Sequence, residues 1–183
     1  MLLTVLKYAG IVLAVLFVVF IAGAYLMPKT INVERDITID APPAEVFPYV
    51  NNYKKFNEWS PWANRDPDAT YTYSGPEAGE GAKMSWEGSE SVGAGSQTIT
   101  ASEENRRVET ELDFGDQGTA QAYFNLEPRS DGTETNITWG MNSDMGNNPI
   151  ARWMGLMMDR WVGTDYEKGL KNLKETVEAE QGS

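Results

Sequence analysis

The chain has 183 residues, 41% of them hydrophobic, which allows one domain with a sizeable core but makes two such domains cramped. It has no cysteine and no histidine. Disulfides, zinc–thiolate sites and thiol nucleophiles are therefore excluded, and the side chain most used for proton transfer and transition-metal binding is missing. The net charge of -12 opposes binding to phosphate backbones, which requires clustered Lys and Arg. We expect no nucleic-acid partner, no metal and no cofactor.

An uncharged apolar segment covers residues 8–27. As an α-helix rising about 1.5 Å per residue, this segment spans roughly 30 Å, the thickness of a bilayer core. Lys7 and Lys29 bracket it, as is typical of a helix that crosses a membrane. We predict a transmembrane anchor over residues 1–28 and one folded domain over residues 29–183.

A cleaved signal peptide is the alternative interpretation of this segment, because Ala22-Gly23-Ala24 fits the small-x-small cleavage pattern. The apolar run continues through Tyr25-Leu26-Met27, past that pattern, which favours an uncleaved single-pass anchor. From the basic residues on each side we expect the N-terminus inside and the domain outside, in the periplasm or the extracellular space. The linker, Pro28 to Thr30, reaches at most about 10 Å, so the domain must sit on the bilayer surface.

Alternation of apolar and polar residues predicts a half-buried strand at the start of the domain. Its apolar positions are Ile31, Val33, Ile37 and Ile39, and Arg35 is the one charged residue on the same face. Pro42-Pro43 then opens a helix, where a fixed φ and a missing N–H cost little. A second short helix is predicted around Tyr53 to Asn57.

From about residue 70 the pattern predicts strand after strand, separated by glycine-rich turns. Segments 107–114, 120–126 and 133–141 alternate in the same way, which indicates an antiparallel sheet with one apolar face and one solvated face.

After Asn148-Pro149 the period changes to that of a long helix. Because this helix is so apolar, we expect it to lie on the sheet, with Gly163 and Gly169 marking close packing or a bend. The predicted apolar stripe consists of Met154, Met158, Val162, Tyr166, Leu170, Leu173 and Val177, widened in its first half by Trp153, Met157 and Trp161.

This order of elements resembles the SRPBCC (START/birch-allergen-like) superfamily, nearest to its polyketide cyclase/dehydrase-like branch in the form with an N-terminal membrane segment. The stretches that carry the resemblance are APPAEVFPYV leading to FNEWSPWA, then TYSGPEAGEGAKMSWEG, and finally MDRWVGTDYEKGLKNLKE. It covers residues 31 to about 180 and implies an α+β helix-grip fold. In that fold a curved antiparallel sheet of about seven strands wraps the long C-terminal helix and leaves an apolar cavity between them.

The helix-grip architecture suggests where a ligand would bind. The candidate ligand-binding residues, in the cavity or at its rim, are Trp59, Trp62, Trp86, Phe114, Trp139, Trp153, Met154, Met157 and Arg35. Trp59 and Trp62 stand at one end, where they form either the rim of a ligand mouth or a plug of core. The methionines either line a cavity that accepts varied apolar shapes or fill gaps in a core. Arg35, if buried, needs a ligand carboxylate or phosphate, or an acid of the protein itself.

The leading functional hypothesis is a membrane-anchored, non-catalytic module that binds a lipid or another hydrophobic small molecule. A cyclase- or dehydrase-like enzyme is the first alternative, in which Arg, Tyr and carboxylates would polarise a carbonyl; the missing histidine weighs against it. The second alternative is an accessory subunit of a membrane complex, whose anchor packs against a membrane-protein partner through Ala9-Gly10 and Ala22-Gly23-Ala24.

Overall fold

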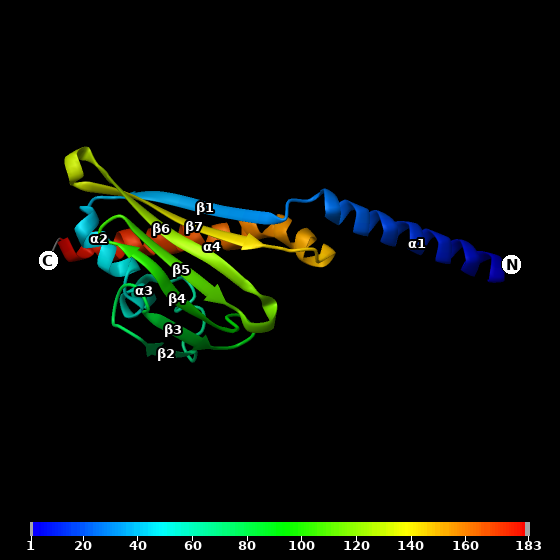
Figure 1. The fold of residues 1–183 in the computed structure, drawn as a ribbon, viewed down its shortest axis with the longest axis horizontal. Coiled ribbons are helices and arrows are strands. Elements are labelled where there is room, and N and C mark those ends of the chain that lie inside the picture. Colours follow the sequence, from blue (N-terminus) through cyan, green and yellow to red (C-terminus); the bar gives the residue numbers. More distant parts are fainter. Residues whose placement is uncertain (1, 182–183) are drawn as a thin grey trace.

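The computed structural model describes residues 2–181. Helix α1 (Leu2–Leu26) projects away from the sheet and the other helices (Figure 1). The domain elements are, in chain order, β1 (Thr30–Ile39), α2 (Pro43–Val50), α3 (Tyr53–Trp59), β2 (Thr70–Ser74), β3 (Lys83–Glu87), β4 (Ala94–Glu103), β5 (Arg107–Asp113), η1 (Gly115–Gln117), β6 (Thr119–Arg129), η2 (Ser130–Gly132), β7 (Glu134–Asp144) and α4 (Pro149–Gln181).

The seven strands form one antiparallel sheet in the order β1-β7-β6-β5-β4-β3-β2. The first strand of the domain therefore pairs with the last, with Val33 opposite Met141 and Ile37 opposite Ile137. Helix α4 packs mainly against β1 and runs along one face of the sheet, while α2 and α3 lie at the end of the sheet near the C-terminus of α4 (Figure 1). This arrangement confirms the predicted α+β helix-grip fold.

The two short helices begin where local chemistry predicts. Pro42 is the N-cap of α2, with an extended backbone, and Pro43 is its first helical residue. A backbone N–H at that position would have no acceptor within the helix, so proline costs little there. Asn52 caps α3, because its side-chain oxygen accepts hydrogen bonds from the backbone N–H groups of Lys54 and Lys55. Helix α3 continues to Trp59, two residues beyond the predicted Asn57, which brings this tryptophan onto the helix rather than the turn after it.

Glycines on α4 let the helix approach the sheet closely. A Cβ atom at Gly169 would lie 2.8 Å from the indole ring of Trp139, and one at Gly163 would collide with the guanidinium of Arg35. Both glycines are buried, so the prediction of close packing at these two positions is confirmed.

The second half of the predicted apolar stripe is buried as expected, whereas in its first half Met158 and Val162 are only half-buried. Met154, Met157 and Trp161 are exposed, so the expectation that the whole apolar stripe faces the sheet is wrong. The buried face of this half instead carries Arg152 and Gly155. Because residues along a helix are separated by about 100°, a face that contains Gly155 and Gly163 turns Met157 and Trp161 to the opposite side.

Candidate ligand-binding site

Aromatic side chains fill the space between α4 and the sheet at the end next to α3. Trp139 of β7 stacks on Tyr166 of α4, with ring centroids 3.9 Å apart and 9° between the planes. Trp59 meets Trp139 edge-on at 5.3 Å and Phe56 at 4.8 Å. Phe124 of β6 completes the group, 5.1 Å from Trp139. These five rings, called here the aromatic core, occupy the interior at this end, because each is at most 5% exposed.

Trp59 lies inside the aromatic core. It has no exposed surface, its indole Nε1 donates to the Tyr49 carbonyl at 3.0 Å, and its own carbonyl accepts from Asn172 of α4 at 3.0 Å. Of the two roles considered for this residue, the geometry matches the plug of core. Trp62 lies at the edge of the same group, half-buried, with its ring 5.6 Å from Trp139 and 6.3 Å from Tyr166.

A set of half-buried apolar side chains packs against the core beyond Trp62. Trp86 of β3 and Phe114, just after β5, meet edge to face at 6.0 Å. Ile31 and Ile37 of β1 are half-buried against the same core. The other residues of this kind, called here the half-buried set, are Trp62, Tyr71, Trp86, Leu112, Phe114, Met158 and Val162. Its members come from β2, β3, β5, α4 and the loops beside them. Because they are only half-buried, they leave apolar surface in contact with solvent, whereas the aromatic core is buried.

Arg35 lies under α4, where Gly163 leaves room for its guanidinium. Its Nε donates to Glu167 at 2.7 Å and its Nη1 to Asp159 at 2.9 Å, so the protein itself supplies the acids expected as one alternative for this residue. The hydrogen bond from Arg35 holds the pKa of Asp159 below its ordinary value, and the positive charge adds to that effect. Both acids are largely exposed, so the arginine is within reach of solvent.

The three remaining candidates lie away from the interior. Trp153 stacks on Phe20 of α1, and Met154 and Met157 are exposed on α4. The structure thus brings Trp59, Trp62 and Trp139 together, and Trp86 with Phe114, but it places Trp153 against α1 and leaves Met154 and Met157 exposed on α4. Their role in binding a ligand stays a prediction.

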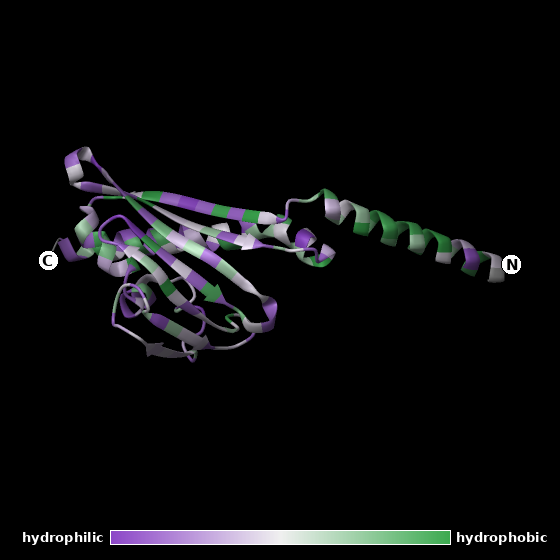
Figure 2. Cartoon of the chain, in the orientation of Figure 1, coloured by the Kyte–Doolittle hydropathy of each residue, from purple (hydrophilic) through white to green (hydrophobic). Residues whose placement is uncertain are grey.

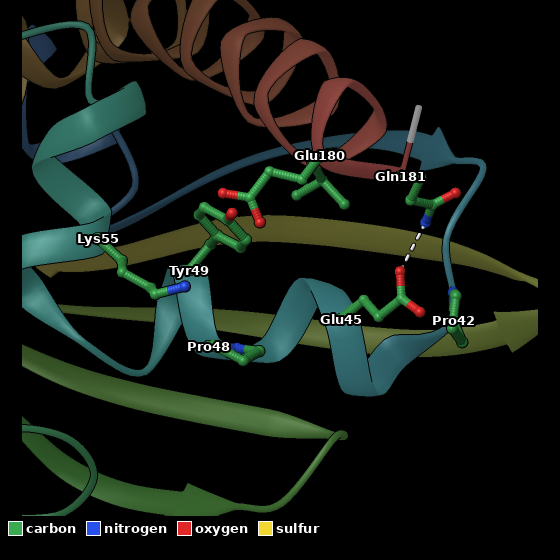
Figure 3. A pocket seen from close by; sticks show the side chains of 8 residues that line it. Pro42, Glu45, Pro48, Tyr49, Lys55, Glu180 and Gln181 are labelled. Atoms are coloured by element: carbon green, nitrogen blue, oxygen red, sulfur yellow. Dashed lines mark hydrogen bonds between the residues drawn. The ribbon is translucent and has the colours of Figure 1, made fainter. Parts of the chain in front are cut away.

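The sequence interpretation did not anticipate two surface grooves. The larger, about 610 Å³, lies between α2, α3 and the end of α4 (Figure 3). Glu45, Lys55 and Glu180 are among its lining residues, and Gln181 donates to Glu45 across it at 2.8 Å. The smaller, about 300 Å³, is lined by residues that include Tyr53, Lys54 and Lys83. Neither lies between α4 and the sheet, and their charged rims suit an apolar ligand less well than the half-buried set does.

Two tyrosine hydroxyls lie below these grooves. Burial raises the pKa of Tyr49, the nearby Glu180 raises it further, and burial likewise raises the pKa of Tyr53. Both hydroxyls therefore stay protonated at neutral pH. No spacing in the sequence could have revealed these grooves, because their linings come from separate elements with ordinary surface residues.

The fold and the apolar surfaces define a helix-grip protein, in which a sheet of seven antiparallel strands packs against one long C-terminal helix. Residues 30–178 match the family described as polyketide cyclase / dehydrase and lipid transport, and the chain belongs to this family. No curated protein matches the sequence significantly.

Solved structures show the same fold at low identity. A protein from Rhodobacter sphaeroides has a TM-score of 0.59 and 18% identity over 81% of this chain and 93% of its own. The protein Ara h 8.0201 has a TM-score of 0.55 and 15% identity over 82% of this chain and 99% of its own. The di-domain ARO/CYC BexL from the BE-7585A biosynthetic pathway has a TM-score of 0.56 and 18% identity, over 80% of this chain and 46% of its own. At such identities the likeness establishes the fold alone.

Proposed function

We propose that this protein is a membrane-anchored module that binds a lipid or another hydrophobic small molecule without converting it chemically. The observation that carries the proposal is the half-buried set, which presents apolar surface beside the aromatic core. Apolar area of this kind is costly to leave in water, at about 25 cal/mol per Å², and a hydrophobic ligand would cover it. Membership of a family whose description includes lipid transport supports the same function.

The ligand contacts come mainly from the half-buried set. Trp62, Trp86 and Phe114 provide large apolar surfaces, and Trp139 lies behind Trp62. Arg35 is suited to a ligand headgroup, because its present partners are exposed carboxylates that a ligand carboxylate or phosphate could replace.

Anchoring is supported by α1. Its Thr4–Leu26 portion is long and apolar enough to cross a membrane, and Figure 2 shows it as the most continuously hydrophobic stretch of the chain. Only residues 27–29 separate α1 from β1, so the domain is held against the bilayer. We propose that the domain lies on the outer side, with Lys7 and the N-terminal amine on the inner side.

The anchor is tested by carbonate extraction of membranes that contain the full-length chain. We expect the protein to stay in the membrane pellet with its N-terminus intact. Release into the supernatant, or an N-terminal sequence that begins at Tyr25, would contradict the anchor and favour a cleaved signal peptide.

Ligand binding is tested with a fluorescent fatty acid and detergent-solubilised protein. Replacing Phe114 by Glu puts a charge into the half-buried set, and we expect probe affinity to fall at least tenfold, because an unpaired carboxylate opposes an apolar guest. Thr72→Glu is the control, since Thr72 is exposed on β2 and points to the opposite face from Tyr71. Equal probe binding by both variants, with both folded, would contradict the site.

A further inference from the structure

The exposed side of α4 changes character along the helix. Ile150, Met154, Met157 and Trp161 are between 47% and 59% exposed. Their spacing of four, three and four residues places them on one stripe, opposite the buried face. Seven residues beyond Trp161 the same stripe carries Lys168, which is exposed. The first three turns of α4 thus present large apolar side chains outward, and the later turns present charged ones.

This α4 stripe, defined as Ile150, Met154, Met157 and Trp161, begins beside the C-terminal end of α1. Trp153, the neighbour of Met154, stacks on Phe20 of α1 at 5.7 Å and donates its Nε1–H to the Phe20 carbonyl at 3.1 Å. Phe20 lies about 10 Å along the helix from the end of the apolar segment at residue 27. When α1 spans a membrane, Trp153 therefore lies about 10 Å inside the end of the apolar segment, among the acyl chains, and the stripe continues from there along α4 toward the membrane surface.

Arg152 fixes α4 to α1. Its side chain is buried, donates to the Ala24 carbonyl at 3.3 Å and to the Gly146 carbonyl at 3.0 Å, and lies over the ring of Tyr25. A cation near the C-terminus of a helix also interacts favourably with the helix dipole. These contacts join the two helices, so the structure places the start of the α4 stripe beside the end of α1.

We propose that the α4 stripe is a second membrane contact, which inserts into the lipid interface beside α1 and holds the domain in one orientation on the bilayer. The proposal rests on the membrane anchoring proposed above. Lipid is the occupant that the structure favours, because α1 carries the stripe to the interface. A net charge of -12 also disfavours electrostatic adhesion to anionic headgroups, so the contact must be apolar. Trp161 is the member of the stripe that lies furthest along α4 from α1. Tryptophan is a residue type that prefers the boundary between lipid and water.

Single cysteines test this proposal cleanly, because the natural chain has none. Full-length Met154→Cys, Met157→Cys and Lys168→Cys variants are labelled with the environment-sensitive fluorophore NBD and reconstituted into phosphatidylcholine vesicles. The vesicles are prepared with and without lipid brominated near the headgroup end of the acyl chain. We expect blue-shifted emission at 154 and 157, quenched severalfold more by brominated lipid than emission at the control position 168.

Three results would overturn the proposal, and they are distinguishable. If carbonate-resistant protein shows NBD at 154 and 157 as water-exposed as at 168, the stripe does not contact lipid, although the anchor stands. If NBD at 154 and 157 is shielded from water but not quenched by brominated lipid, a second copy or another protein covers the stripe. If carbonate releases the chain from the vesicles, the anchor itself fails and the stripe fails with it.

Discussion

The indole of Trp139 lies flat against the phenol of Tyr166, 3.9 Å between centroids, and this stacked pair joins the last strand of the sheet to the middle of α4. Both residues are buried, and a Cβ atom at Gly169, one turn further along α4, would lie 2.8 Å from the Trp139 ring and 3.1 Å from Pro61. The pair is therefore a direct contact between β7 and α4, in addition to the longer contact that α4 makes with β1.

Tyr166→Ala is expected to lower the free energy of unfolding by about 3–5 kcal/mol, because it removes a buried ring and leaves a cavity against Trp139. Trp161→Ala is the matched control on the same helix, and we expect a change within about 0.5 kcal/mol because Trp161 is exposed. Denaturant unfolding of the detergent-solubilised chain measures both. Similar losses in the two variants would show that the stacked pair is not a special point of contact.

The buried glycines of α4 provide a second comparison. Gly169→Ala should destabilise the protein by about 1–3 kcal/mol, because the new methyl group meets the rigid ring of Trp139 and Pro61. Gly163→Ala should cost less, because the new methyl group meets the far end of the long Arg35 side chain, which can shift more easily than a packed ring, and because the helix gains up to about 1 kcal/mol of intrinsic propensity. Thermal unfolding of the two variants decides the order; the reverse order would contradict this account of close packing.

The two tryptophans of the Trp-Ser-Pro-Trp stretch should separate stability from binding. Trp59→Ala should lose about 3–5 kcal/mol of unfolding free energy, since it empties part of the aromatic core. Trp62→Ala should lose about 1 kcal/mol but should weaken fatty-acid probe binding, since this ring is half-buried beside the proposed ligand. Paired unfolding and probe titrations test this. Unchanged probe binding by a folded Trp62→Ala variant would remove Trp62 from the site.

The ion pair of Arg35 predicts a pH dependence. The pKa of Asp159 is lowered from its ordinary value of 3.8 by the hydrogen bond from Arg35. A carboxyl group whose pKa is lower when folded stabilises the protein above its unfolded pKa, and this contribution disappears as the pH falls through the folded pKa. Wild type should therefore be more stable than Asp159→Asn at pH 7, and the difference should shrink below about pH 4. A difference in unfolding midpoint that is constant from pH 7 to pH 3 would contradict this.

The sequence by itself determined the fold of this protein and the character of its N-terminal helix. Local patterns predicted the strand that begins near Ile31, the helix that begins at Pro42-Pro43 and the long helix after Pro149. Such patterns are sufficient because they show which face of each strand or helix is apolar. The aromatic stretches that resemble the superfamily led to the same fold, which the family match and the structure confirm.

Only the tertiary structure decided what each apolar side chain contacts. Periodicity could not show that Trp59 is enclosed while Trp62 is half-buried, because both follow from how α3 meets α4. It also could not show that Met154 and Met157 point outward. The orientation of α4 is set by Gly155 and Gly163 against β1 and by Arg152 against α1, contacts between segments more than a hundred residues apart. The spacing of apolar residues in a sequence shows that one face of a helix is apolar. Whether that face packs against the rest of the protein or stays exposed depends on how distant elements pack together.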